Sequence, residues 1–372
     1  MTRVQEKGAS VTRASLDSAI DWLDRIDPGA HRRVKGLRLV TAYGIAALTG
    51  AALAATSASP EHAPLALLAG GFALWASVCE GRATRLESAR DLGLLSAGAV
   101  VGAAFTAALT PWLAHGGPVL PEATLVLGAF VVGYARRWGI LGSGIGAQFF
   151  IGQLLAYGLQ LTGADSPTIV VAGLIAAVSS IVPRMLSGPA EQPAVAAPTP
   201  AVAPRRWLET ETVMGLQAAL AALAIGVLDG KLGLTESAWA LAACTFVIAN
   251  TSAGTVARIR QRVIGTAIGL PLGLACLPLA EHAAIAVWVA AAVAMIVYAV
   301  ALPERYDVAC GAYTFTLVVT LAASGEHSVL LLSARLWETL LGGVLGLAAA
   351  SFFFPLRELS GPAQHSSIER TP

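Results

Sequence analysis

The chain has 372 residues, of which 56% are hydrophobic and 13% are charged, and its mean hydropathy is +0.69. Soluble domains carry roughly 25% charged residues, so this composition indicates an integral membrane protein and excludes an ordinary soluble domain. The net charge of +1 argues against nucleic acid as a partner, because a phosphate-binding surface needs a basic excess.

Residues 1–35 are polar and contain no apolar core behind a basic start, so no cleavable signal peptide is expected. Apolar residues with acidic residues between them recur here at helical spacing: Leu16, Ile20, Leu23 and Ile26. The pattern predicts a short amphipathic helix in a cytoplasmic segment. Its acidic face suits anionic lipids poorly, which favours a solvated lead-in over a helix in the membrane interface.

Twelve apolar segments predict transmembrane helices, six in residues 36–186 and six in residues 207–357. The first six are Leu37–Ser57, Ala63–Cys79, Leu92–Leu109, Ala123–Ala135, Leu141–Leu161 and Thr168–Ile181. The second six are Val213–Leu228, Ser237–Asn250, Val263–Leu279, His282–Ala301, Val308–Ala323 and Leu330–Phe354. Several fall short of the roughly 20 residues that a perpendicular span requires, so some helices are expected to be short or broken. The Pro/Ala-rich residues 187–206 predict a cytoplasmic linker, and residues 358–372 predict a disordered tail.

Basic residues fall in every second loop if the N-terminus lies in the cytoplasm. The cytoplasmic segments then hold Arg32, Arg33, Lys35, Arg38, Arg82, Arg85, Arg90, Arg136, Arg137, Arg184, Arg205, Arg206, Arg258, Arg260, Arg262, Arg305 and Arg357. The opposite loops offer only Lys231, plus Arg335 at a helix entrance. The positive-inside rule therefore predicts that both termini are cytoplasmic.

The two sets of six segments resemble each other. The matched positions are Gly98 and Gly102 with Gly269 and Gly273, and residues 146–150 with residues 311–315. Because six is an even number, both halves keep the same orientation in the membrane. The expected fold is an all-α integral membrane protein of about twelve transmembrane helices, arranged as two parallel six-helix repeats.

Glycines four residues apart share one helical face and let another backbone approach closely. Two such faces are Gly265/Gly269/Gly273 and Gly342/Gly346. We expect both to pack against other helices, either within one chain or across a homodimer.

Two motifs in the second half resemble the FUSC (fusaric acid resistance-like, aromatic acid exporter) family. One motif is Arg262, Gly265, Thr266 and Gly269, and the other is Arg335, Glu338, Thr339, Gly342 and Gly346 followed by Pro355. The resemblance covers about Thr212 to Leu356. It implies a bacterial inner-membrane protein that exports aromatic or other organic acids with the proton-motive force. Long members carry a large cytoplasmic domain between their halves, where this chain has only its linker. Related plant anion channels leave a channel as an alternative.

Arg335 and Glu338 lie three residues apart and hence on one helical face. Arginine binds a carboxylate bidentately, and a neighbouring carboxylate can exchange protons, so this pair is a candidate site for coupling substrate to protons. The alternative is a structural salt bridge.

Gln148 lies in a glycine-rich segment and matches Tyr313 in the repeat, so the two side chains could line one substrate site near the pseudo-twofold axis. Phe149, Phe150 and Phe315 are candidates to stack on an aromatic ring. The alternative is that these residues make ordinary contacts between helices.

Arg258 and Arg262, together with Arg136 and Arg137, are candidates for a cytoplasmic vestibule that concentrates anions. The alternative is that they only anchor helix ends by the positive-inside rule.

The expected partners are a small organic anion, protons and membrane lipid, with a homodimer and a periplasmic adaptor protein left open. No Walker A pattern occurs, and the four cysteines form no CxxC pair, so we expect neither ATP-driven transport nor a metal or other cofactor. No constellation of nucleophile and base is recognised, so an enzyme is not expected. A third hypothesis is a membrane scaffold that transports nothing.

Overall fold

The computed structural model describes residues 25, 27, 30–56, 64–82, 84–117, 120–187, 209–234, 237–249, 252–302, 304–323 and 329–353. The first half contains α2 His31–Thr56, α3 Leu65–Cys79, α4 Arg85–Ala114, α5 Ala123–Tyr134, α6 Gly139–Gly158 and α7 Ser166–Leu186. The second half contains α8 Thr210–Leu232, α9 Ser237–Val247, α10 Ser252–Ala275, α11 Leu277–His282, α12 Ala284–Ala301, α13 Tyr306–Ala323 and α14 Val329–Phe352. The short 3-10 helices η3 Leu120–Glu122, η4 Ala135–Trp138 and η5 Gly163–Asp165 lie between helices of the first half. Nearly all of the predicted N-terminal helix and linker, and all of the C-terminal tail, lie outside the described residues.

Six helical stretches of the described chain are long and apolar enough to cross a membrane. They are His31–Thr56, Arg85–Ala114, Leu120–Gly158, Gly163–Leu186, Thr210–Leu232 and Ala253–Leu279. Shorter apolar helices accompany them: Leu65–Cys79, Ser237–Val247, Ile285–Ala301, Tyr306–Ala322 and Trp337–Phe352. By length and composition the chain is therefore a multi-pass α-helical membrane protein.

The predicted bounds need correction around α9 and α10. α9 has 11 residues and ends at Val247 rather than Asn250. At 1.5 Å per residue it is about 16 Å long, roughly half the hydrocarbon thickness. α10 begins at Ser252 rather than Val263, because arginine is a good helix former and the helix continues back through Arg258 and Arg262. These arginines thus stand on a helix, so their spacing decides which of them share a face.

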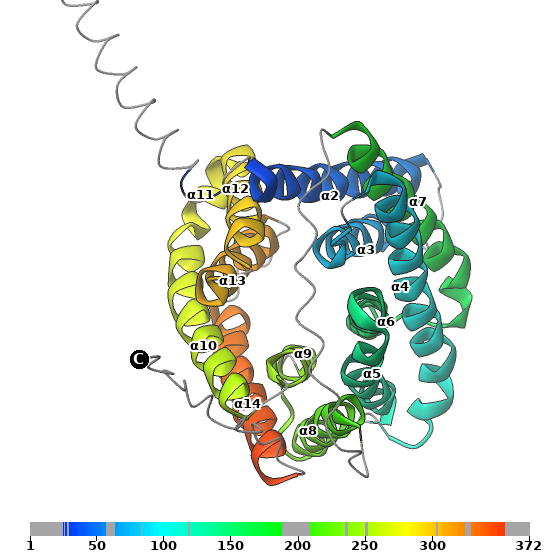
Figure 1. Cartoon of the computed structure of the whole chain (residues 1–372), viewed down its shortest axis with the longest axis vertical. Coiled ribbons are helices and arrows are strands. Elements are labelled where there is room, and N and C mark those ends of the chain that lie inside the picture. The colour runs from blue at the N-terminus through cyan, green and yellow to red at the C-terminus, as the bar shows by residue number, and fades with distance from the viewer. Residues whose placement is uncertain are drawn as a thin grey trace, which may run out of the picture.

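The helices form a closed ring in which the two halves meet twice (Figure 1). Around the ring, α2 packs on α7, α7 on α4, α4 on α6 and α6 on α5. α5 then packs on α8 of the second half. In that half α8 packs on α9, α9 on α14, α14 on α10, α10 on α13 and α13 on α12. The ring closes where α12 packs on α2. One apolar core lies at each junction between halves: the first combines α5 and α6 with α8 and α9, and the second combines α2 and α3 with α12 and α13.

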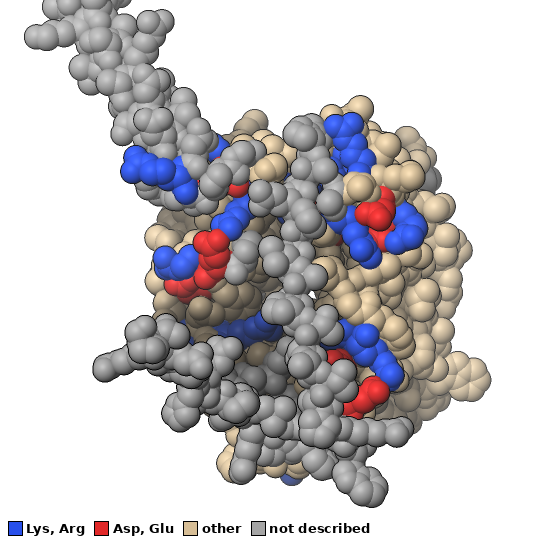
Figure 2. Space-filling model, in the orientation of Figure 1, with Lys and Arg blue, Asp and Glu red and all other residues tan. Residues whose placement is uncertain are grey.

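Helix ends alternate between two faces of the ring. On one face, Lys35 near the start of α2 donates to the backbone carbonyl of Glu80 after α3, and Arg137 before α6 pairs with Glu209 before α8. Figure 2 shows Lys and Arg side chains gathered on this face, several beside acidic ones. We call it the basic face. On the opposite face, Glu122 before α5 accepts a hydrogen bond from Tyr157 at the end of α6.

Close backbone contacts fix α4 on α6 and α10 on α13. A Cβ atom at Gly102 would overlap the carbonyl oxygen of Phe149, and one at Gly269 would overlap that of Gly311. Gly265 faces the backbone of Asp307 in the same way. Of the other predicted packing glycines, Gly273 lies against Val318, Gly342 against Ala240 and Gly346 against Val247 and Cys244. All five predicted packing glycines therefore meet neighbouring helices of their own chain.

The pattern of neighbours recurs in the two halves. α4 packs on α6 and α7 as α10 packs on α13 and α14. α3 packs on α7 as α9 packs on α14, and α5 packs on α6 as α12 packs on α13. The junction of α5 with α8 has its counterpart in the junction of α12 with α2.

Candidate functional site

The two halves bring arginines together at the C-terminal end of the short helix α9. Beyond Val247, the backbone carbonyl of Ile248 accepts a hydrogen bond of 3.4 Å from the Arg136 guanidinium. Arg136 belongs to η4 in the first half, whereas α9 belongs to the second. The last carbonyls of a helix lack intrahelical donors and carry partial negative charge, so a guanidinium stabilises this end. Arg136 therefore caps a helix of the other half.

Arg258 and Arg262 on α10 extend this group. Arg258 is exposed and lies within electrostatic range of Arg136, and Arg262 follows four residues later on the same helical face. The Arg262 guanidinium contacts the Tyr306 hydroxyl at 3.5 Å, and its Nε is buried without a hydrogen-bond partner among the described residues. Within that part of the chain, none of the three pairs with a carboxylate. We call Arg136, Arg258 and Arg262 the arginine group.

Arginines at the same face of the first half lie beside carboxylates instead. Arg38 and Arg184 approach the buried carboxylate of Glu80 at 3.6 and 3.9 Å. Arg82 donates a hydrogen bond of 2.7 Å to Asp91, whose side chain is also buried. Each of these carboxylates lies beside two arginines and partly compensates their charge, whereas the arginine group has no described carboxylate beside it and keeps a positive potential that can attract an anion.

Arg137 differs from the other predicted vestibule residues. Its guanidinium pairs with Glu209 at 3.1 Å and lies over the rings of Tyr134 and Trp138, 4.9 and 5.7 Å from their centroids. A carboxylate and two aromatic rings therefore already engage it. The structure brings three of the four predicted vestibule arginines into one group and gives Arg137 a structural contact.

A cluster of large aromatic side chains lies at the other junction between the halves. Trp75 of α3 contacts Tyr298 of α12 and Tyr313 of α13, with ring centroids 6.5 and 5.4 Å apart. The two tyrosines are themselves 6.1 Å apart. Tyr313 lies within electrostatic range of Arg262, so a guanidinium and aromatic rings occur close together. The sequence indicated Tyr313 but not Trp75 and Tyr298, whose only local signal is an aromatic side chain with a polar atom inside an apolar helix.

Gln148 is fully buried on α6 and lies beside Gly98 of α4. Neither amide atom of Gln148 has a hydrogen-bond partner among the described residues. Its predicted match to Tyr313 shifts by one residue, because Gly98 faces the carbonyl of Ile145 whereas its counterpart Gly269 faces that of Gly311. Gln148 then corresponds to Thr314.

The three predicted stacking phenylalanines contact their own surroundings instead of sharing one site. Phe149 contacts Phe105, and Phe150 contacts Phe246 across the first junction between halves. Phe315 packs with the apolar residues between α12 and α13.

Glu338 is fully buried on α14 and has an interaction partner. One turn later Gly342 packs on Ala240, so Glu338 lies at the depth of the start of α9, towards the opposite face. The side chain of Arg335 lies outside the described part of the chain, so the predicted Arg335–Glu338 pair stays a prediction.

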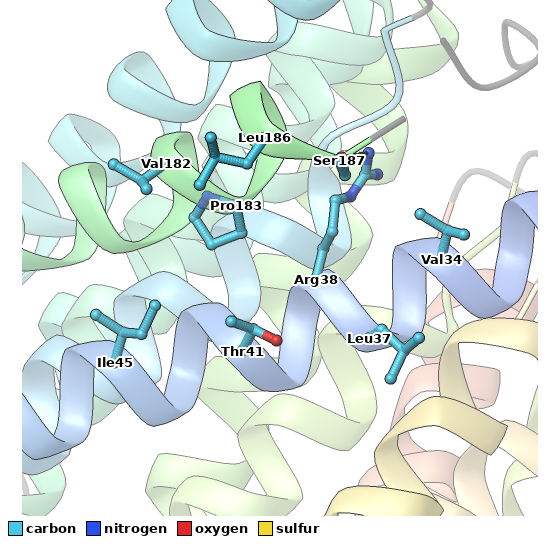
Figure 3. Close-up of a pocket in the computed structure, with 9 residues that line it drawn as sticks. All are labelled: Val34, Leu37, Arg38, Thr41, Ile45, Val182, Pro183, Leu186 and Ser187. Atoms are coloured by element: carbon cyan, nitrogen blue, oxygen red, sulfur yellow. Dashed lines mark hydrogen bonds between the residues drawn. The ribbon is translucent and has the colours of Figure 1, made fainter. Parts of the chain in front are cut away.

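A groove of about 500 Å³ runs between α2 and α7 near the basic face (Figure 3). Apolar side chains line most of it, and those of Leu37, Ile45 and Leu186 are exposed on the outer surface of the ring. Its one arginine, Arg38, already approaches Glu80. The groove therefore resembles a lipid-facing furrow more than an anion site.

Residues 215–349 match the family model described as fusaric acid resistance protein-like. The second half of the chain is therefore similar to this family over these residues. The matched region contains Arg258, Arg262 and Tyr313, whereas Arg136 and Trp75 come from the half outside it. The family indicates a membrane protein of transport or efflux. No curated protein and no solved structure matches the chain.

Proposed function

We propose that this chain is a secondary exporter of small organic anions, in particular aromatic carboxylates, in a bacterial inner membrane. The observation that carries the proposal is the arginine group, three guanidinium groups from both halves with no carboxylate beside them in the described chain. A carboxylate accepts bidentate hydrogen bonds from a guanidinium, and Nε of Arg262 is a buried donor that no described residue engages. The family to which the second half is similar supports efflux.

The site would act in two steps. Arg258, exposed on the basic face, attracts the anion from the cytoplasm. Arg262 then binds its carboxylate, while an aromatic ring packs against the nearby Tyr313, Trp75 and Tyr298 by offset or edge contacts. The second step needs a partly buried positive group near an aromatic surface, and Arg262 and Tyr313 provide this combination.

The proposed topology has twelve spans in two parallel six-helix repeats, with the basic face and both termini in the cytoplasm. The recurrence of helix neighbours in the two halves supports the repeat, and the charges of the basic face support the orientation. In this orientation an inside-negative potential favours anion export by about 2.3 kcal/mol per charge and 100 mV. Coupling to protons would add to this driving force.

An anion channel on the same scaffold is the second candidate, because unpaired arginines would also select anions in a pore. A channel only equilibrates its substrate, whereas a coupled exporter accumulates it against a gradient. A scaffold that transports nothing is the third candidate, and it predicts no flux.

Uptake into inverted membrane vesicles tests the proposal. An imposed proton gradient would drive a labelled aromatic carboxylate, and we compare the unaltered chain with Arg258→Gln and Arg262→Gln. A hydrogen bond to a charged group contributes about 1.5–3 kcal/mol, so we expect uptake to fall by roughly 10- to 100-fold. Arg260→Gln is the matched control for Arg258→Gln, since it removes the same charge from another exposed position of α10, two residues away and on another helical face.

Three other outcomes are informative. Unchanged uptake in both variants, at normal protein level, would remove the arginine group from the mechanism. Flux that equilibrates regardless of the gradient would favour the channel. No flux across a panel of organic acids would favour the scaffold. The variants Arg335→Ala and Glu338→Gln in the same assay test the predicted coupling pair.

A further inference from the structure

The junction of α5 with α8 contains a second polar site, at the end opposite the arginine group. Glu122 ends η3 immediately before α5 and is only 2% exposed. Its Oε1 atom accepts hydrogen bonds from the Tyr157 hydroxyl of α6 at 2.9 Å and from the Ser237 hydroxyl of α9. The site thus joins helices from both halves near the opposite face.

The other carboxylate oxygen, Oε2 of Glu122, faces α8. A Cβ atom at Gly226 would lie 3.2 Å from it, and Asp229 follows three residues later on the same helical face. The carboxyl groups of Glu122 and Asp229 lie within hydrogen-bonding range of each other. Oε2 itself is buried and receives no hydrogen from any described donor.

No cation compensates this pair in the described part of the chain. Neither Glu122 nor Asp229 forms a salt bridge there, and Lys231 on α8 is exposed. His115, at the end of α4, is exposed, and its Nδ1 interacts with the carbonyl of Pro111. Tyr157 on α6 is the remaining titratable group in contact, while Glu338 on α14 lies at a similar depth. Two carboxylates this close without a cation repel each other when both are ionised, which favours a proton on the buried one, Glu122.

We propose that Glu122 and Asp229 form a proton-binding site that opens to the opposite face and serves the coupling of anion export to protons. In this site the proton is bound to Oε2 of Glu122. The protonated Glu122 then donates a hydrogen bond to the Asp229 carboxylate. This inference rests on the proposed function for its physiological role, but the proton site itself stands on the geometry of the junction.

The two carboxyl groups differ in their access to water. Asp229 is partly exposed near the end of α8, where one of its oxygens accepts a hydrogen bond of 2.7 Å from the Leu234 amide. Glu122 lies behind it and is buried. A proton from the opposite face can therefore reach Asp229 first and Glu122 second. Loss of the proton leaves two negative charges in contact, and their repulsion would push α5 and α8 apart.

The same helix connects this site to the arginine group. α5 begins directly after Glu122 and leads through η4 to Arg136, which caps α9. If α5 moves relative to α8 at the end that binds the proton, Arg136 at the other end of α5 would therefore move with it. This rigid connection is a physical route by which proton binding and anion binding could influence each other.

Infrared difference spectroscopy on the purified full chain tests the proton site without any substrate. A protonated carboxyl group absorbs separately from a carboxylate, so a pH titration reports it directly. We expect the unaltered chain to show this band at neutral pH, and Glu122→Gln and Asp229→Asn each to lose it. The control Asp165→Asn, which removes a partly exposed carboxylate on the same face, should keep the band. A band that survives in both site variants would overturn the proposal.

A paired transport assay tests the coupling role and separates it from the proposed function. Reconstituted protein is assayed for exchange of a labelled aromatic carboxylate at equal pH, and for accumulation driven by a proton gradient. For Glu122→Gln we expect complete loss of gradient-driven accumulation, while exchange stays measurable. Accumulation retained in this variant, or exchange lost together with it in a folded variant, would overturn the coupling role. No exchange by the unaltered chain would contradict the proposed export, while the infrared result would still decide the proton site.

Discussion

At the scale of single residues, the contact between α4 and α6 depends on the absence of a side chain at Gly102. A Cβ atom there would overlap the Phe149 carbonyl, and backbone cannot move aside as a flexible side chain can. We predict that Gly102→Ala destabilises the protein by about 1–3 kcal/mol or more through overpacking. Loss of monodisperse protein on heating in detergent measures the change.

Gly93→Ala is the control, because Gly93 lies on the same helix with open space around its Cβ position. It should change the free energy of unfolding by no more than about 0.5 kcal/mol. Equal effects of the two substitutions would contradict this account.

Individual side chains also mark the limit of what the sequence could predict. The packing glycines were identified because their spacing of four follows from helix geometry alone. Arg258 and Arg262 were identified because charge in an apolar context is conspicuous. Glu122 was missed, since it becomes notable only when the fold brings Tyr157 and Asp229 to it from 35 and more residues away.

At the scale of elements, a buried ionic network holds the ends of α2, α3, α4 and α7 together. Glu80, directly after α3, lies between Arg38 and Arg184 and is itself buried. We predict that Glu80→Gln destabilises the protein by about 3–5 kcal/mol, because it leaves buried positive charge without compensation. The midpoint of thermal unfolding in detergent measures this.

Glu304→Gln is the matched control for the network. Glu304 also pairs with an arginine, Arg32 of α2, which lowers the pKa of its carboxyl group. That pair is exposed and screened by water and salt, so its loss should leave the unfolding midpoint unchanged. If the two variants behaved alike, burial would not distinguish these ion pairs.

The ends of the helices are harder to predict from the sequence than the number of helices. Hydropathy gave a helix for each predicted segment, because apolar length is a local property. It could not give the end of α9 at Val247, since that end is capped by Arg136 from another half of the chain. Nor could it give the start of α10, where charged residues continue the helix. Ends that depend on distant partners are outside the reach of a local pattern.

At the scale of the whole molecule, the ring has two junctions, and parts of the proposed mechanism lie at both. Arg136 and Glu122 lie at the two ends of the junction of α5 with α8, and the aromatic cluster lies at the junction of α2 and α3 with α12 and α13. A transporter that moves one half against the other would deform both junctions together. The sequence suggested two similar halves, but only the folded ring reveals which helices join them.

The orientation of the ring in the membrane gives the last prediction. The proposed topology puts Lys231, at the end of α8, outside the cell and Arg305, between α12 and α13, inside it. Both are exposed, so each can be replaced by cysteine with little effect on folding, in a chain whose four native cysteines are changed to alanine. A membrane-impermeant maleimide should label Lys231→Cys in intact cells, and Arg305→Cys only in inverted vesicles.

Labelling of both positions from one side would contradict the alternation of helix ends across the membrane. The reverse pattern would keep the fold but turn the basic face outward, against the positive-inside rule. The arginine group would then face the wrong compartment to collect anions for export.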